Sequence, residues 1–161
     1  MKTLQDLFVH QLQDLYSAET QLADALQKMQ DHATDNSLKH AFAEHLEETR
    51  IQKKRIEQAC QIVDVSPEGD RCKAIAGIIA EAEDFIKEAS ESSVMDAGLI
   101  ANGQRVEHYE IAAYGTAAHY AKELGYAEVE DILKQTLNEE KSADEKLNEL
   151  ALERINQRAE A

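Results

Sequence analysis

Hydrophobic residues recur at three- and four-residue steps through four long stretches of the chain, the spacing that places them on one face of an α-helix. A shorter stretch has the same pattern. We therefore expect four long helices and one short helix, over residues 3–31, 37–63, 71–89, 93–124 and 127–157. No alternating pattern of the β type accompanies them, so the sequence predicts an all-α protein.

The connections between these stretches indicate how the helices are arranged. Residues 31–37 are rich in turn formers, and Gly125 closes the third long pattern, so each of these two short connections joins a pair of antiparallel neighbours. Residues 64–92 instead form a long connection that carries the short helix. One long crossover is typical of a ferritin-like four-helix bundle. We expect residues 1–161 to form one such domain.

Seven polar residues interrupt the hydrophobic faces of the four long helices. Five lie on the faces themselves, and two glutamates lie on the flank. One buried carboxylate costs several kcal/mol unless it is paired, neutralised or bound to a metal. Several at one level predict a shared cation site, with the ligands Glu19, His45, Glu48, Glu107, Glu110, Glu140 and Asp144.

The rise of a helix, about 1.5 Å per residue, tests whether these residues lie at one level. Glu19 and the pair His45/Glu48 are each roughly 20 Å from the turn that joins their helices. Glu107/Glu110 and Glu140/Asp144 are each about 25 Å from the turn at Gly125. Each hairpin therefore brings its own candidates together, and mid-bundle placement in both predicts one common site.

Six carboxylates and one imidazole are mostly hard oxygen donors, which favour iron or manganese over copper or structural zinc. One ion would not use seven ligands, whereas two ions bridged by carboxylates would. We expect a dinuclear centre of iron or manganese.

Other interpretations remain open for individual residues. Glu48 and Glu107 would also suit water-facing flank positions, and His45 would suit a core edge where it bonds a carbonyl group. Glu139 is an alternative to Asp144, because its neighbour Glu140 lies on the face. Three tyrosines are candidates either for donors to the carboxylates or for plain packing: Tyr16, Tyr109 and Tyr114.

Composition narrows the classes of function. The net charge of −15 argues against binding to nucleic acid or to an anionic membrane. No hydrophobic run approaches the roughly 18 residues of a spanning helix, and the N-terminal residues do not resemble a signal peptide. We expect a cytoplasmic protein. Cys60 suits a small core residue, and a bridge to Cys72 is a minor alternative.

Four stretches around the candidate ligands resemble the YciE/YciF family of ferritin-like bacterial stress proteins: DLYSAETQL (14–22), FAEHLEETRIQ (42–52), VEHYEIAAYGT (106–116) and LNEEKSADEKL (137–147). The resemblance spans essentially the whole chain. It implies a dimeric ferritin-like bundle with a dinuclear metal centre, and it places ligands at Glu19, in His45/Glu48, in Glu107/Glu110 and in Glu140/Asp144.

The ligand pattern departs from the usual ferritin-like one, in which two helices supply Glu and the other two supply Glu-x-x-His. Here the helix of residues 37–63 has the reverse order, His45-x-x-Glu48, and the last two helices supply only carboxylates. The centre is thus almost entirely carboxylate, and a specific activity does not transfer from the pattern.

Three hypotheses of function follow, and the sequence assigns no catalytic residue. The favoured one is an oxidoreductase that uses the metal pair on peroxide or dioxygen, in which Glu48 or Glu107 would relay a proton. The second is metal storage or detoxification, which would need a large closed shell. The third is a non-catalytic interaction protein with a structural metal.

Overall fold

The computed structural model describes residues 1–160 and is helical throughout, with no strand in that range. The helices are α1 (Leu4–His32), α2 (Asn36–Val63), α3 (Lys73–Glu88), α4 (Ser92–Glu123), α5 (Ala127–Leu150) and α6 (Asn156–Ala159), with a π-helical turn, η1 (Ala151–Ile155), before α6. The four long helices and the short fifth helix lie where the hydrophobic pattern predicts them.

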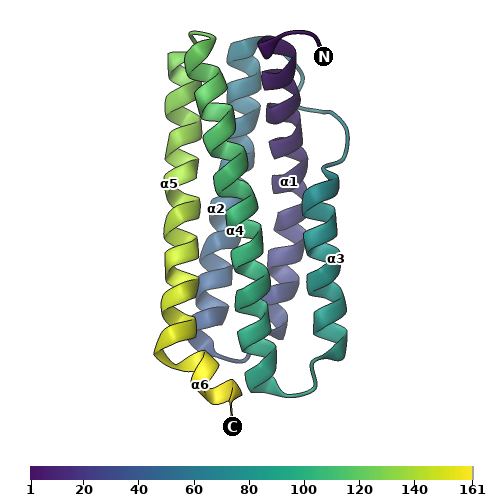
Figure 1. Ribbon diagram of the computed structural model, residues 1–161, viewed down its shortest axis with the longest axis vertical. Helices are drawn as coiled ribbons and strands as arrows, with labels where there is room; N and C mark the ends of the chain where they lie inside the picture. Colours follow the sequence, from purple (N-terminus) through teal and green to yellow (C-terminus); the bar gives the residue numbers. More distant parts are fainter. Residues whose placement is uncertain (161) are drawn as a thin grey trace.

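The four long helices form a bundle in which every neighbour is antiparallel (Figure 1). Around the bundle, α1 packs against α2 and α4, and α5 packs against the same two helices. The segment that contains α3 runs the length of the bundle from the end of α2 to the start of α4 and packs outside α1 and α4. This single long crossover confirms the predicted ferritin-like topology.

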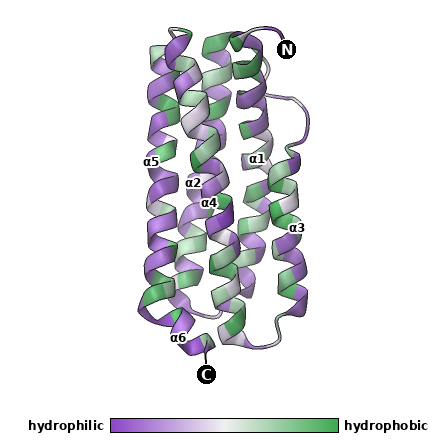
Figure 2. Cartoon of the chain, in the orientation of Figure 1, coloured by the Kyte–Doolittle hydropathy of each residue, from purple (hydrophilic) through white to green (hydrophobic). Residues whose placement is uncertain are grey.

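Hydrophobic residues recur along every long helix (Figure 2). Their buried side chains form two main clusters inside the bundle. One lies toward the start of α1 and includes Phe8, Leu12, Ile56 and Leu133. The other lies toward the α1–α2 turn and includes Leu26, Met29, Phe42, Leu99 and Leu147. On each long helix a buried polar residue lies between these two clusters: Glu19 on α1, Thr49 on α2, Glu107 on α4 and Glu140 on α5.

Side-chain caps begin α1 and α2, and a glycine follows the end of α4. Thr3 and Asp6 form a capping box at the start of α1. Asp35 caps α2 by accepting hydrogen bonds from the backbone N–H groups of Ser37 and Leu38. Gly125 follows α4 with φ 81°, in the left-handed region that favours glycine.

Buried Asp96 fastens the α1–α2 turn to the start of α4. Its carboxylate accepts hydrogen bonds from the backbone N–H and the hydroxyl of Thr34, both at 2.6 Å, and from the backbone N–H of Asp35 at 3.0 Å. These bonds give the buried carboxylate of Asp96 its hydrogen-bond partners.

The crossover is fastened to the bundle by a second polar group. The Tyr109 hydroxyl donates a 2.5 Å hydrogen bond to Asp14 and lies 3.0 Å from the Sγ atom of Cys72. The backbone N–H of Cys72 donates to the hydroxyl of Ser17 at 2.9 Å. Cys60 and Cys72 are both buried free thiols, and Cys60 lies in the core as expected.

The last helix differs from the expectation. The pattern predicts one α-helix over residues 127–157, but α5 ends at Leu150 and the π-helical turn follows. This turn buries Ala151 and Ile155 and bends the chain across the end of the bundle (Figure 1). Arg154 and Arg158 then both reach Asp35. Long-range ion pairs of this kind leave no periodic signal in the sequence.

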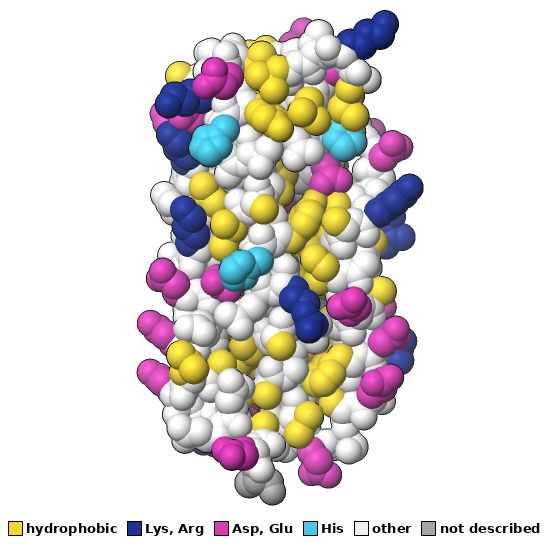
Figure 3. Space-filling view, in the orientation of Figure 1, with side chains coloured by type: hydrophobic (Ala, Val, Ile, Leu, Met, Phe, Trp, Pro, Cys, Tyr) yellow, Lys and Arg dark blue, Asp and Glu magenta, His cyan; other side chains and the backbone are white. Residues whose placement is uncertain are grey.

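On one face of the molecule, charged side chains lie along both edges and hydrophobic side chains lie along the middle (Figure 3). Among residues 1–160, no helix combines the length and the apolar character needed to cross a bilayer.

The contact of α3 with α4 depends on Gly98, because a Cβ atom there would lie 1.9 Å from the Phe85 ring. We expect Gly98→Ala to lower the free energy of unfolding by about 1–3 kcal/mol through overpacking. Gly77, in exposed helix with no atom within 4 Å of an added Cβ, is the matched control. Gly77→Ala should stabilise by about 0.5–1 kcal/mol. Urea unfolding of both variants checks the pair, and equal stabilities would contradict this packing.

Candidate metal centre

Four of the seven predicted ligands converge in the middle of the bundle. One ligand atom from each of His45, Glu107, Glu110 and Glu140 can be chosen so that all four lie within 4.8 Å of one another. The group draws on three helices: α2 supplies the imidazole, α4 the two glutamates one turn apart, and α5 the fourth residue. The expected convergence of the two hairpins at one height is therefore present.

The imidazole lies between carboxylates of two other helices. His45 Nδ1 is 3.4 Å from an oxygen of Glu107, and His45 Nε2 is 3.7 Å from an oxygen of Glu140. All four side chains are buried, with Glu110 and Glu140 at 0% exposure. Glu107 is only 1% exposed, which excludes the alternative that it faces water on the flank.

Polar atoms without hydrogen-bond partners are concentrated around these four residues, in the middle layer of the bundle. Within residues 1–160, nine buried side-chain oxygen or nitrogen atoms have no hydrogen-bond partner: Glu19 Oε2, His45 Nε2, Thr49 Oγ1, Gln52 Oε1, Glu107 Oε2, both carboxylate oxygens of Glu110 and both of Glu140. Buried polar groups are normally paired, because each unpaired one costs about 1–3 kcal/mol. A cation that accepts lone pairs from these oxygens would satisfy most of them at once, so this donor set fits a metal.

Glu19 lies beside the four-residue group and extends it to α1. It is fully buried, and its Oε1 atom accepts a hydrogen bond from the hydroxyl of Tyr114 on α4. The pKa of Glu19 is raised by burial and by the charge of Glu140, which places these two carboxylates in one electrostatic environment. Of the three candidate tyrosines, Tyr114 is thus a donor to a buried carboxylate.

Burial shifts the pKa values in this layer towards the neutral forms. It raises the pKa values of Glu19, Glu107 and Glu110 well above the ordinary range, and nearby Glu140 adds to the effect. Burial also raises the pKa of Glu140 itself to about 7 and lowers that of His45 to about 4. A neutral imidazole and carboxyls that hold their protons are the expected state without a cation.

The other two predicted ligands lie at the edges of this group. Asp144 is partly exposed; its carboxylate accepts a 3.2 Å hydrogen bond from Gln104 and lies 3.4 Å from His108. Glu48 is half-buried, and burial together with the charges of Glu139 and Glu44 raises its pKa. Their role as ligands stays a prediction.

Glu139, the alternative to Asp144, is held away from the group. Arg55 forms an ion pair with it at 2.5 Å, and Gln52 donates a hydrogen bond to it at 3.1 Å. Sequence reasoning missed Gln52, although it lies seven residues after His45, which places both on one helix face. Thr49, four residues after His45, lies on the same face, and its buried hydroxyl is one of the unpartnered atoms.

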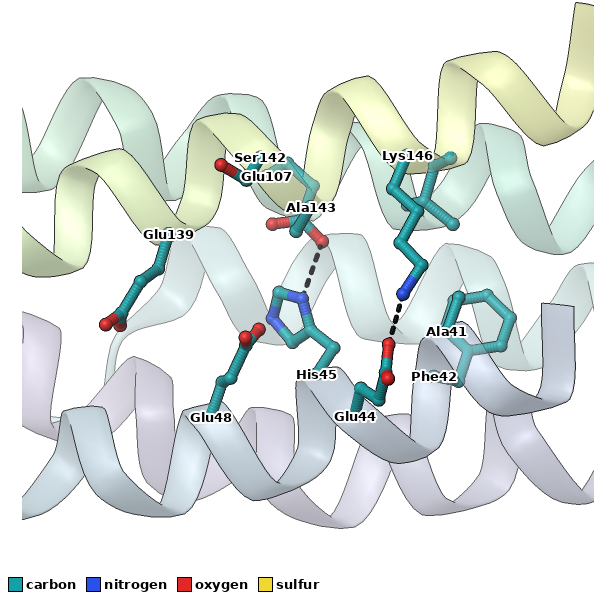
Figure 4. Close-up of a pocket in the computed structure, with 11 residues that line it drawn as sticks. Ala41, Phe42, Glu44, His45, Glu48, Glu107, Glu139, Ser142, Ala143 and Lys146 are labelled. Carbon is teal, nitrogen blue, oxygen red and sulfur yellow. Dashed lines mark hydrogen bonds and ion pairs between the residues drawn. The ribbon is translucent and has the colours of Figure 1, made fainter. Parts of the chain in front are cut away.

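A pocket of about 170 Å³ leads from the surface to this group between α2 and α5 (Figure 4). His45 and Glu107 line its inner end, and Phe42 and Leu147 supply hydrophobic walls. Glu44 and Lys146 line it as an ion pair that joins the two helices. The centre is therefore buried but reachable by a small solute.

The fold and the centre together define a ferritin-like helical bundle with a buried His/Glu cluster that could hold metal. The chain belongs to the DUF892 family, whose model, described as a domain of unknown function, matches residues 3–160. It is 45% identical over 161 residues to Protein YciF of Escherichia coli (strain K12), which covers 99% of this chain and 97% of that protein. The resemblance to the YciE/YciF family is thus confirmed.

Solved structures agree with this assignment. The crystal structure of the E. coli stress protein YciF matches with a TM-score of 0.93 at 45% identity, over 97% of this chain and 99% of that one. YcfI from Rhodopseudomonas palustris matches with a TM-score of 0.90 at 44% identity, over 92% and 94%. A protein from Xanthomonas campestris pv. campestris, 21% identical with a TM-score of 0.74 over 99% and 100%, shares the fold.

The raised carboxyl pKa values predict how the stability of the metal-free protein varies with pH. The native state keeps protons that the unfolded chain loses above the ordinary value of 4.5, so stability should fall as the pH rises through the folded pKa values, including about 7 for Glu140. His45 opposes this trend only below its ordinary value of 6.5. Between pH 6.5 and 8 we expect a loss of about 1 kcal/mol per pH unit for each proton retained.

Urea unfolding in the presence of a chelator measures this dependence. Glu140→Gln removes one titrating group while keeping its shape, so its profile should be flatter than that of the wild type. A wild-type stability that stays constant from pH 6.5 to 8 would contradict the raised pKa values.

Proposed function

We propose that the buried cluster binds two ions of iron or manganese and that the protein acts in a stress response through redox chemistry on a small oxidant, peroxide or dioxygen. The observation that carries the proposal is the set of nine unpartnered buried polar atoms in one layer. A fold that needed only packing would be more stable with hydrocarbon at these positions.

The residues divide into two overlapping ligand sets. His45, Glu107, Glu110 and Glu140 would surround one ion, because their ligand atoms lie within 4.8 Å of one another. Glu19 would bind the second ion, which would share carboxylates of the first set as bridges. Predominantly hard oxygen donors favour iron or manganese, and bound ions of either metal would supply the reversible one-electron chemistry that the side chains lack.

The chain's own residues would prepare this chemistry. The bundle excludes bulk water from the layer, which strengthens electrostatic interactions within it. Tyr114 orients Glu19 through its hydroxyl, and this hydrogen bond also provides a proton at the Glu19 oxygen. The lowered pKa of His45 keeps the imidazole neutral over the physiological pH range, so one of its two ring nitrogens has a lone pair available to a cation.

The stress response, the cytoplasmic location and the dimer belong to this proposal. YciF of E. coli is described as a stress protein, and it is the relative that supports a similar role here. A homodimer is proposed instead of the large closed shell that storage would need. Light scattering separates these forms, since a particle of 12 or 24 subunits would favour metal storage.

Elemental analysis of the full-length protein purified without added metal tests the centre. We expect about two ions of iron or manganese per chain, and a strongly reduced content in Glu110→Gln and Glu140→Gln, because each change removes a carboxylate from the innermost group. Glu145→Gln is the control, since Glu145 is an exposed acid on the same helix as Glu140.

The activity is tested separately from the binding. A metal-loaded protein that consumes peroxide or dioxygen, together with a Glu140→Gln variant that does not, would support the redox function. One ion per chain would contradict a dinuclear centre. Two ions without consumption of either oxidant would contradict the redox role and leave the metal as a structural element.

A further inference from the structure

The pocket between α2 and α5 connects the surface with the unpartnered atoms of the buried layer (Figure 4). Two of these atoms, His45 Nε2 and Glu107 Oε2, belong to residues that line the pocket and are at most 5% exposed. These two atoms therefore lie at the inner end of an open path without hydrogen-bond partners. A cation that follows the path would reach them before the other unpartnered atoms of the layer.

Carboxylates line the pocket from its mouth to these two buried atoms. Glu44, Glu48 and Glu139 all line the pocket. Two are held by cations: Lys146 pairs with Glu44 across the mouth, and Arg55 pairs with Glu139. Glu48 is half-buried and points toward the His45 ring from the same helix (Figure 4). It is placed to take up an incoming cation and pass it to the buried donors.

A second pocket that reaches the layer differs in the charge of the side chains that line it. A pocket of about 360 Å³ between α1 and α2 reaches Glu19 and Thr49, and its other charged lining residues are Arg50, Lys53, Lys54 and Glu57. The ammonium group of Lys53 lies 4.9 Å from the centre of the Tyr16 ring. Three positive side chains against the one carboxylate of Glu57 leave this opening net positive, which disfavours entry of a divalent cation. Of the two openings, the one between α2 and α5 is the one that attracts it.

We propose that the pocket between α2 and α5 is the route by which divalent cations reach and leave the buried cluster, with Glu48 as a transient ligand on the route and the Lys146–Glu44 ion pair as the barrier at its mouth. The inference rests on the proposed metal binding and adds the path and the residues that set its rate.

Kinetics of Mn²⁺ exchange test this route in the metal-free full-length protein. A residue that acts only on the path changes the rates of association and dissociation by the same factor and leaves Kd unaltered. For Glu48→Gln we expect both rates to fall by about tenfold, because Glu48 lies outside the innermost group of four residues and the variant removes a charge that stabilises the ion only while it is on the route. Stopped-flow transfer from a fluorescent chelator measures association, and transfer to excess EDTA measures dissociation.

Glu47→Gln is the matched control for this variant. Glu47 is the neighbouring residue on α2, carries the same charge and is exposed, but it does not line the pocket. Its variant should exchange Mn²⁺ at wild-type rates. Circular dichroism and urea unfolding show whether both variants keep the fold.

The barrier at the mouth is tested by Lys146→Ala. Removing this cation frees Glu44 and opens the path, so both exchange rates should rise about threefold while Kd stays the same. Lys141→Ala, an exposed lysine on the same helix, is the control with the same loss of charge.

The outcomes separate the route from the site. Wild-type Mn²⁺ binding with unchanged exchange rates in Glu48→Gln and Lys146→Ala would overturn the route. A Glu48→Gln variant with a weaker Kd and a wild-type association rate would also overturn it, because Glu48 would then be a resident ligand. A wild-type protein that binds no Mn²⁺, no Fe²⁺ and no other divalent ion would instead contradict the proposed function.

Discussion

Burial of several carboxylates in one layer of a hydrophobic bundle is the constraint on which this structure depends. Each charged carboxylate taken out of water costs several kcal/mol, and like charges nearby add to the cost. Without a cation the layer offsets the cost by holding protons, as the raised pKa values of Glu19, Glu107, Glu110 and Glu140 indicate. A cation bound here would replace those protons, so its binding would be coupled to proton release.

The two hydrophobic clusters on either side of the layer stabilise the fold and so offset the free-energy cost of the buried carboxylates. They hold all four long helices above and below the layer, so that carboxylates from different helices stay at one level even though they repel one another. The long crossover determines which helices are neighbours and places α4 between α1 and α5. The candidate ligands of both hairpins meet because of this connectivity.

Periodicity predicted the fold and most of the centre because both depend on which face of a helix a residue occupies. His45, Glu110 and Glu140 interrupt hydrophobic faces, and the structure brings them together. The pattern placed Glu107 on the flank because a helical-wheel projection gives only the angular position of a residue around its helix. Burial also depends on how closely α2 and α5 approach α4. The pattern did not indicate Gln52, because an uncharged amide on a helix face does not signal a buried ionic site. The π-helical turn before α6 comes with contacts of Arg154 and Arg158 with Asp35, 119 and 123 residues away in the sequence, and such long-range contacts leave no periodic signal.

Tyr109 and Glu110 are consecutive on α4 but have different partners. Tyr109 contacts Asp14 and Cys72, where the crossover is fastened to the bundle, whereas Glu110 belongs to the buried layer. A small rotation or axial slide of α4 that repositions Glu110 must therefore also displace the Tyr109 hydroxyl relative to Asp14 and Cys72. The loop before α3 is thus mechanically linked to the interior, so a rearrangement among the glutamates would be transmitted to the outer surface of the molecule about one helix diameter away.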